Sequence, residues 1–294
     1  MAQQIIFPQA EEPKTLQNFL KKRFPMGYVR RLFRKNAVRL NDKRSGPNQR
    51  AGPGDRIRLL FPFEKRGRDS VKKTPVTRRL EILFEDDDFF LLNKPAGIAV
   101  HEGKGILKRH SLLGILQATC GIQAVTPKLV HRIDKDTSGL LVVAKNDTVA
   151  SKLEKQFEIG RVEKVYLALV MGRLRFKEGR IDNPLPGRDG RLVRALTLYR
   201  VKQEFSTTSL LEVRIKTGRR HQIRHHLAKL GHPVVMDAQH GNFAFNKQFR
   251  TTYGLKRQFL HATSITFEHR GKKRKWTIPI PDDLEKTLEA LQSH

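Results

Sequence analysis

A series of short strand-like segments from residue 80 onward constrains the fold more than any other feature of the sequence. The segments span residues 80–84, 89–92, 140–144, 165–170, 207–215, 259–267 and 275–280, and turn signals separate them. Two longer stretches, 148–157 and 219–230, have the apolar spacing of helices. Strands outnumber helices, and several are close enough to form hairpins. We therefore predict an α+β fold with a mixed, mainly antiparallel sheet flanked by helices.

Positive charge is concentrated in the N-terminal part of the chain. The 294 residues include 58 Lys and Arg against 29 Asp and Glu, a formal net charge of +29, and residues 1–80 carry 21 of these cations but only 6 of the acids. Hydrophobic residues make up 38% of the chain, which is enough for a real core and excludes a disordered basic tail. We expect a small basic module ahead of a larger domain, with nucleic acid as the partner. An acidic membrane surface is the alternative.

Two short helices are expected in the basic module, with a turn marked by Pro25 and Gly27 between them. Their inward positions are Leu16, Phe19, Leu20, Val29, Leu32 and Phe33. Short strands are expected to follow over 37–41 and 55–61. Cations four residues apart on the second helix lie beside one another, away from its apolar positions. These cations are Arg30, Arg31, Arg34 and Lys35. The stripe fits a phosphate backbone, and a merely solvated helix face is the alternative.

The arrangement of these helices and strands resembles the αL RNA-binding module, which is named after a small-subunit ribosomal protein. The segment that follows contains Pro, Gly and many cations but almost no apolar periodicity, which is typical of a linker. We predict an αL-type RNA-binding domain over residues 1–61, a basic linker over 62–79 and a larger domain over 80–294.

A polar loop over residues 129–139 stands directly before an apolar strand. Loops fixed by a rigid sheet are where catalytic groups usually sit. Arg132 and Lys135 flank Asp134 and would keep its carboxylate ionised, as a nucleophile needs. The polar side chains of residues 136–138 are expected to bond their own backbone in a turn.

This loop and several other segments resemble the motifs of the RluA-type pseudouridine synthases. The matching segments are residues 131–134 with 137–141, 93–97 with 100–101, 164–172, 195–199, 217–224 continuing to 231–234, and 260–262. They occur in the family's order, and an αL module joined to this catalytic domain is a familiar arrangement. One departure follows Asp237, where His240-Gly241 stands in place of the family's usual Tyr-Gly.

The resemblance implies a pseudouridine synthase fold and the isomerisation of uridine in RNA to pseudouridine. The N1–C1′ bond breaks, the base turns and C5 bonds to C1′, so no cofactor and no metal are expected. By resemblance Asp134 is the catalytic carboxylate, which attacks or stabilises the anomeric carbon, and Arg224 pairs with it. Tyr166 would stack on the uracil and assist removal of the C5 proton. Without the other matching motifs, Tyr166 would be interpreted as an ordinary aromatic residue of a β-strand.

Further cations are expected to contact the RNA. A target base inside folded RNA must leave its stack, and the resemblance makes Arg132 the candidate that fills the gap. Lys94, Arg219 and Arg220 are expected to contact only the RNA backbone.

Two histidines, His221 and His225, stand four residues apart on a predicted helix, as zinc ligands can. The sequence shows no third ligand near them. We therefore expect them to serve in capping, packing or RNA contact.

With its αL module, the chain most resembles the family members that act on large-subunit (23S) ribosomal RNA. The resemblance therefore implies that substrate, with transfer RNA as the alternative. A catalytically silent RNA-binding or ribosome-assembly factor is the main alternative from another class. The joint presence of Asp134, Tyr166 and Arg224 speaks against it. A sugar-nucleotide transferase using Asp134 and Asp136 to hold a divalent metal is a third interpretation, although hard cations usually need more oxygen ligands.

The sequence shows neither a membrane-spanning segment nor a signal segment. No run approaches the roughly 20 apolar residues of a spanning helix, and residues 1–8 lack a basic start followed by an apolar stretch. The single cysteine, Cys120, excludes an internal disulfide and a thiolate-rich zinc site. We expect a cytoplasmic protein whose partner is RNA, and we favour a monomer.

Overall fold

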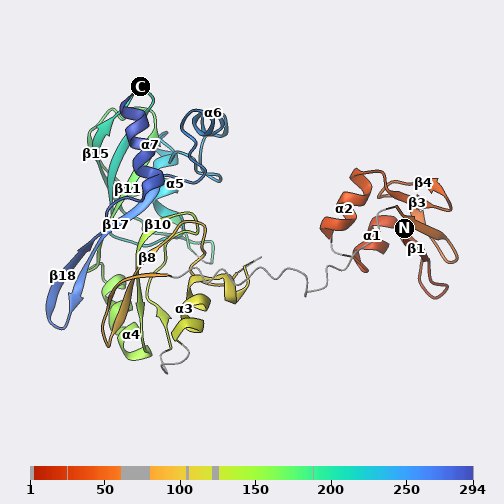
Figure 1. Ribbon diagram of the computed structural model, residues 1–294, viewed down its shortest axis with the longest axis horizontal. Helices are drawn as coiled ribbons and strands as arrows, with labels where there is room; N and C mark the ends of the chain where they lie inside the picture. Colours follow the sequence, from red (N-terminus) through yellow and green to blue (C-terminus); the bar gives the residue numbers. More distant parts are fainter. Residues whose placement is uncertain are drawn as a thin grey trace. The chain divides into compact units, whose positions relative to one another are not determined.

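The computed structural model describes residues 3–24, 26–60, 80–103, 106–120, 126–187 and 189–293. Contacts group the chain into two compact units, Met1–Val76 and Thr77–His294, and each is described by itself (Figure 1). The expected linker over 62–79 and the turn residue Pro25 lie outside the described residues. The domain boundaries drawn from the sequence therefore stay predictions.

The N-terminal unit packs two helices against a four-stranded sheet. Its elements are β1 (Gln3–Ile6), β2 (Lys14–Thr15), α1 (Leu16–Lys21), α2 (Met26–Arg34), β3 (Val38–Leu40), β4 (Lys43–Arg44), β5 (Arg50–Ala51) and β6 (Arg56–Leu59). The sheet has the order β1-β6-β3-β4, and β2 pairs with β5. The apolar positions expected to face inward are buried, except for the half-buried Phe33, and they share one core with Phe7 and Ile57. Thr15 caps α1 because its side chain accepts a hydrogen bond from the Asn18 backbone N–H.

The C-terminal unit is built on one large sheet. Its strands are β7 (Glu81–Glu85), β8 (Phe89–Lys94), β9 (Lys128–Leu129), β10 (Ser138–Ala144), β11 (Glu163–Met171), β12 (Glu178–Ile181), β13 (Leu185–Pro186), β14 (Leu192–Val193), β15 (Thr197–Glu204), β16 (Thr208–Ile215), β17 (Leu260–His269) and β18 (Lys272–Thr277). Its helices are the 3₁₀ turn η1 (Lys108–His110), α3 (Leu112–Cys120), α4 (Asp147–Glu158), α5 (Gln222–Lys229), α6 (Phe243–Tyr253) and α7 (Asp282–Gln292).

The strand order of this sheet is β12-β15-β16-β11-β17-β10-β8-β7, with β18 beside β17 and β9 beside β10. Strands β10 and β17 are parallel, and the other pairs of this sheet are antiparallel. The predicted mixed, mainly antiparallel sheet flanked by helices is therefore confirmed.

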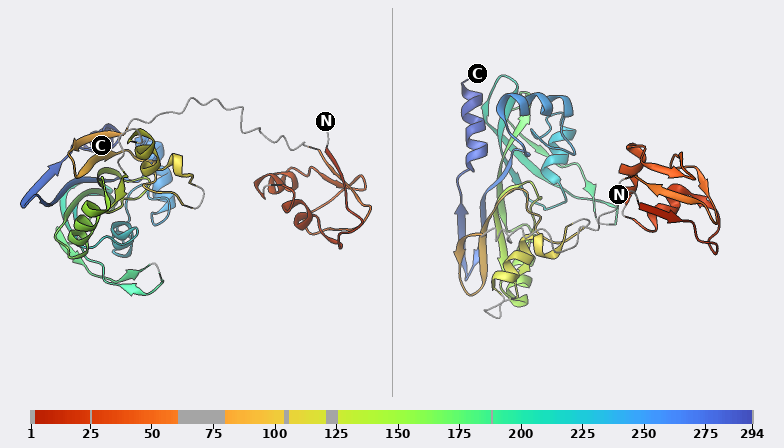
Figure 2. Two further views of the ribbon diagram at one scale, coloured as in Figure 1. Left: turned by 90° about the horizontal axis from the view of Figure 1, so that it is seen from below. Right: turned by 45° about the vertical axis from the view of Figure 1, so that its right-hand side comes forward.

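Alternation along the strands assigns the helices to the two faces of the sheet. On β8, Phe90 shares a core with Leu116 of α3 and Leu227 of α5. Its neighbour Phe89 shares the opposite core with Leu153 of α4, because adjacent strand residues point to opposite faces. The C-terminal helix α7, deep blue in Figure 2, runs beside the sheet and contacts α6.

The helices differ from the prediction in two respects. Helix α5 begins at Gln222 rather than at Arg219, because His221 before it has a left-handed φ of 51° and stands at the N-cap position. The segments that form α3, α6 and α7 were not predicted to be helical. Within the described ranges, no helix has the length and apolar character needed to cross a bilayer.

The parallel pairing of β10 with β17 depends on Gly139. This residue lies opposite Ala262 and has a φ of 118°. A Cβ atom at Gly139 would lie 2.3 Å from the Ala262 carbonyl oxygen, closer than real Cβ contacts allow. The glycine thus lets the start of β10, and the polar loop before it, lie against the centre of the sheet.

Replacing Gly139 with alanine should lower the free energy of unfolding of the C-terminal unit by about 3 kcal/mol, because the unfavourable φ and the backbone clash act together. Gly103 is the matched control, since a Cβ atom there meets nothing within 4 Å. Urea unfolding can be followed by the fluorescence of Trp276, the single tryptophan, which lies in β18 of this unit. Equal unfolding midpoints for Gly139→Ala and Gly103→Ala would contradict the prediction.

Candidate active site

The polar loop before β10 is fixed by backbone hydrogen bonds at two points. The Thr137 N–H donates to the Asp134 carbonyl at 3.1 Å and closes the loop on itself. The Gly97 N–H donates to the Lys135 carbonyl at 2.8 Å and ties the loop to the segment after β8. The Asp134 side chain, which is 17% exposed, is therefore held just before β10 with its carboxylate partly open to solvent.

Lys94 anchors the same loop from inside the protein. Its side chain is fully buried, and its ammonium donates to the carbonyls of Pro95, Ile98 and Lys135 at 2.9 to 3.0 Å. Burial lowers the pKa of Lys94 to about 7, against the attraction of two nearby aspartates. The expected contact between Lys94 and an RNA backbone does not fit this placement, because the ammonium does not reach the surface.

Arg224 joins two carboxylates. Its Nη1 donates to Asp134 Oδ2 at 3.0 Å, while Nε and Nη2 donate to the two Asp237 oxygens at 2.6 and 2.7 Å. Burial acts to lower the pKa of Arg224, but the two carboxylates outweigh it and raise the pKa above its ordinary value. The structure thus brings together the Asp134–Arg224 pair that the resemblance implied.

Asp237 is the member of this network for which the sequence predicted no role in the site. Its side chain is fully buried, and Oδ1 also accepts the backbone N–H groups of Gln239 and His240 at 2.8 and 3.0 Å. Burial alone would raise the pKa of Asp237, but these bonds and those from Arg224 outweigh it and lower the pKa below its ordinary 3.8. The stability that Asp237 contributes is therefore present at neutral pH and lost as the pH falls below about 4. An acid directly after the apolar run 233–236 was the available signal.

A pocket opens over Asp134 and Arg224, and Tyr166, Ile223 and Leu260 supply part of its apolar lining. Burial, and then the Asp134 carboxylate, raise the pKa of Tyr166 far above its ordinary value. The phenol is therefore protonated at neutral pH. Tyr166 therefore contributes an aromatic ring to the pocket wall beside Asp134, and it does not supply a phenolate base.

Two hydroxyls of the loop bond to distant side chains. Thr137 Oγ1 accepts from Gln258 Nε2 at 2.6 Å, and Ser138 Oγ lies 2.8 Å from His261 Nδ1. The expectation that these side chains bond their own turn backbone is therefore wrong. They fasten the loop to β17 and to the residues just before it.

Exposed cations surround the pocket. Arg132 and Arg219 line it, Arg220 lines the adjoining groove, and all three residues are exposed. The Arg219 Nε donates to the Arg194 carbonyl at 3.1 Å, which restrains that guanidinium. In the N-terminal unit the predicted stripe is also exposed: Arg30, Arg31 and Arg34 on α2, and Lys35 one residue beyond its end.

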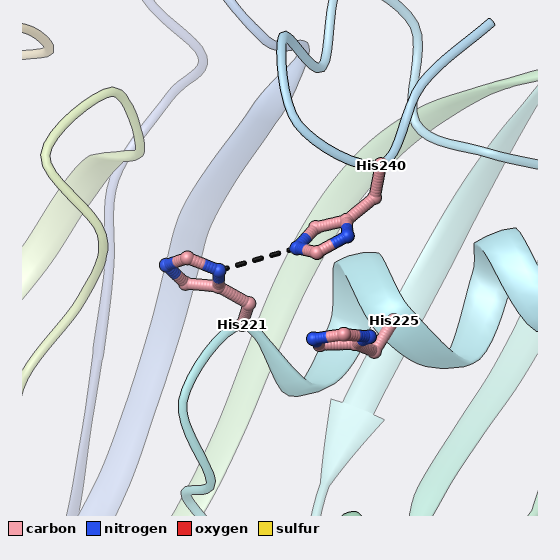
Figure 3. A group of neighbouring side chains, drawn as sticks. All are labelled: His221, His225 and His240. Atoms are coloured by element: carbon pink, nitrogen blue, oxygen red, sulfur yellow. Dashed lines mark hydrogen bonds between the residues drawn. The ribbon is translucent and has the colours of Figure 1, made fainter.

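A third histidine lies beside His221 and His225. Ligand nitrogens of His221, His225 and His240 all lie within 4.8 Å of one another (Figure 3). The expectation that no third ligand stands near the first two is therefore wrong, because the loop after Asp237 returns to the start of α5. His221 also faces the candidate catalytic carboxylate, with its Nε2 3.8 Å from Asp134 Oδ1.

Comparison with known proteins gives one consistent family. Residues 88–229 match the family described as RNA pseudouridylate synthase. The chain is 34% identical to ribosomal large subunit pseudouridine synthase C of Vibrio vulnificus (strain CMCP6), over 95% of this chain and 93% of that protein. The protein of the same name from Escherichia coli (strain K12) is 33% identical, over 96% and 94% of the two chains. The solved structure of human RNA pseudouridylate synthase domain containing 4 shares the fold, with a TM-score of 0.61 at 23% identity over 72% of this chain and 93% of its own.

Replacing Asp237 with asparagine should lower the free energy of unfolding of the C-terminal unit by about 3 to 5 kcal/mol, because the buried guanidinium of Arg224 loses its bidentate partner. The matched control is Asp283→Asn. Asp283 also receives two bonds, from Arg257 at 2.6 and 2.8 Å, but its side chain is 49% exposed. The control should cost less than about 1 kcal/mol. Urea unfolding followed by Trp276 fluorescence gives both values, and equal losses would contradict the prediction.

Proposed function

The chain belongs to the RluA-type family of RNA pseudouridine synthases, and from that premise we propose that it isomerises specific uridines of large-subunit (23S) ribosomal RNA at Asp134. The choice of ribosomal RNA rests on relatives that are named as ribosomal large subunit synthases and match this chain over almost its full length. The reaction is balanced within one nucleotide. The N1–C1′ bond breaks, a C5–C1′ bond forms, the C5 proton leaves and N1 gains a proton.

The observation that carries the proposal is the carboxylate of Asp134 at a partly closed pocket, held by a guanidinium that is itself fixed. Arg224 bonds Asp134 Oδ2 and is locked by two bonds to Asp237. Asp134 Oδ1 is left toward His221 and the pocket. A carboxylate with one oxygen restrained and one available suits attack on, or stabilisation of, the electron-poor C1′ as N1 departs.

Tyr166 serves the base rather than the sugar in this proposal. Its ring lines the pocket beside Asp134, and stacking on the uracil would keep the detached base close while it turns. Because the raised pKa keeps the phenol protonated, its oxygen is a weak acceptor for the C5 proton. We therefore assign Tyr166 to holding the base, and we assign proton removal to no residue.

RNA is held by cations around and away from the pocket. Arg132 is exposed at the pocket mouth, where it would fill the space left by the flipped uridine. Arg219 and Arg220 would contact neighbouring phosphates. The N-terminal unit would act as an αL-type second contact through the exposed cations of α2 and Lys35, joined to the catalytic domain by the basic linker.

Replacing Asp134 with asparagine should reduce isomerisation by at least about 1,000-fold, because the amide is neither a nucleophile nor a full negative charge. RNA affinity should stay within about twofold, since it comes from distributed phosphate contacts. Asp136→Asn is the control, because it makes the same chemical change at an exposed aspartate of the same loop. Carbodiimide-dependent reverse-transcription stops on RNA from cells with each variant give the modification map, and filter binding gives the affinity.

The outcomes of the Asp134 experiment separate the alternatives. Stops that disappear from 23S RNA in the Asp134→Asn strain and remain with Asp136→Asn support the proposal and name the uridines. Stops that disappear from transfer RNA instead would overturn the substrate. An unchanged map would leave a catalytically silent RNA-binding factor.

Replacing both Arg30 and Arg34 with alanine should make the dependence of RNA affinity on salt shallower. The slope of log K against log salt is negative, and its magnitude should decrease by about 0.7 to 0.9 for each phosphate that the protein no longer neutralises. The control replaces both residues with lysine, which keeps the charge and should keep the slope. Filter binding of 23S RNA fragments over a range of salt concentrations measures this. An unchanged slope in the alanine variant would remove α2 from the RNA interface.

A further inference from the structure

Three histidines gather at the start of α5. His221 stands at the N-cap, His225 follows one helical turn later, and His240 comes from the loop after Asp237 (Figure 3). Their ring centroids are 4.0 Å apart for His225 and His240, 5.4 Å for His221 and His240, and 6.4 Å for His221 and His225. All three are half-buried, so solvent reaches the cluster.

The spacing of the ring nitrogens matches the needs of a metal ion. One nitrogen from each ring lies within 4.8 Å of the other two. A tetrahedral zinc ion with bonds of about 2.0 to 2.1 Å holds its ligand nitrogens roughly 3.3 to 3.4 Å apart. His221 Nδ1 and His240 Nε2 are 3.2 Å apart and share a hydrogen bond. Within the described part of the chain no side-chain hydrogen bond is formed by the His225 ring, so that ring can turn toward the other two without losing one.

The backbone around the cluster is fixed. The His240 N–H bonds the buried Asp237 carboxylate at 3.0 Å. Next to it, a Cβ atom at Gly241 would lie 2.2 Å from the Asp237 carbonyl oxygen, so this tight turn of the backbone requires glycine at position 241. At the other side His221 is held in a left-handed conformation with a φ of 51°, which is uncommon for a residue with a side chain. The rings are thus presented from two rigid supports rather than from a mobile loop.

The charges around the cluster permit a cation. Burial lowers the pKa of all three histidines, to about 4 for His221, while the nearby carboxylates of Asp134 and Asp237 act to raise it. Neutral imidazole is the form that binds metal. The guanidinium of Arg224 is already compensated by Asp134 and Asp237. Two exposed cations also act on the cluster: Arg220 on His221 and Lys229 on His225.

We infer that His221, His225 and His240 form a binding site for a divalent transition-metal ion of the zinc class, and that the bound ion restrains Asp134 through His221. Three imidazoles suit zinc, nickel or copper rather than magnesium or calcium. Three protein ligands leave a further position for water. The effect on Asp134 rests on the proposed function, whereas the site itself does not.

The link to Asp134 follows from which nitrogen faces which partner. His221 Nδ1 faces His240, whereas its Nε2 is 3.8 Å from Asp134 Oδ1. An ion on Nδ1 fixes the ring proton on Nε2 and makes that N–H a stronger donor toward the carboxylate. Metal binding displaces the proton that the two rings share in the His221–His240 hydrogen bond. That proton moves to the other nitrogen of the ring that carries it, so no proton is released. Asp134 Oδ1 is then engaged by His221, and the ion should slow isomerisation.

A second group of possible ligands, Asp86, Asp88 and His269, carries no such inference. Asp86 accepts bonds from the backbone of Asp88 and from His269, and Asp88 is paired with Arg270 at 3.1 Å. These atoms already form a closed turn network. Asp88 therefore offers a control position for metal binding.

Metal binding is tested on the full, tag-free chain after treatment with a chelator. Calorimetric titration with Zn²⁺, and the visible absorption of Co²⁺ as a spectroscopic probe, should each show one ion per chain. His225→Gln and His240→Gln should each weaken binding by at least about 100-fold, the upper end of losses seen for outer-shell partners. Asp88→Asn should bind like the unmodified chain. Absence of a one-to-one site, or equal affinity in all four proteins, overturns the inferred site.

The link to catalysis is tested with the same proteins on a 23S RNA fragment. One equivalent of Zn²⁺ should slow isomerisation at least tenfold in the unmodified chain, a chelator should reverse the loss, and His225→Gln should be insensitive. Binding without inhibition overturns the link to Asp134. A chain that binds Zn²⁺ but forms no pseudouridine when free of metal counts against the proposed function and not against the site.

Discussion

The candidate site depends on the ion pairs that the buried guanidinium of Arg224 forms with Asp134 and Asp237. Nε and Nη2 of Arg224 are taken up by Asp237, so only Nη1 is left for Asp134. Asp237 in turn is held by the backbone N–H groups of Gln239 and His240. A buried ion pair is tolerated only when its remaining hydrogen-bonding groups are satisfied, and Asp237 meets that condition. Arg224 can therefore fix one oxygen of Asp134 without enclosing the whole carboxylate.

The sheet explains how residues far apart in the sequence meet at this guanidinium. Ala262 of β17 lies between two strands, opposite Gly139 of β10 on one side and Tyr166 of β11 on the other. A register shift between Val165 and Tyr166 accompanies the second pairing. Because β10 and β17 are parallel, the loop before β10 lies near the start of β17. The position of Tyr166 relative to the Asp134 loop is thus set by the pairing of three adjacent strands.

The sequence predicted those features that depend on local patterns. Alternation and turn residues identified the strands around β10, β11 and β17, and helical spacing identified α4 and the burial of Leu16 and Val29. Helix α3 was missed because Gly114, a poor helix former, interrupts its pattern. A Cβ atom there would lie 1.9 Å from the Lys108 carbonyl oxygen, so the glycine serves packing against η1.

Features that depend on long-range packing were not predictable in the same way. A lysine in a polar motif is usually exposed, yet Lys94 is buried because three carbonyls converge on its ammonium, one of them 41 residues away. Asp237 and His240 belong to the site only because their loop returns to α5. Helix α5 and its N-cap therefore serve two groups at once. Arg224 of α5 reaches inward to Asp134, while His221 at the N-cap and His225 of α5 meet His240. His221 has one nitrogen toward each group, so a single imidazole ring lies between the three histidines and the Asp134 carboxylate.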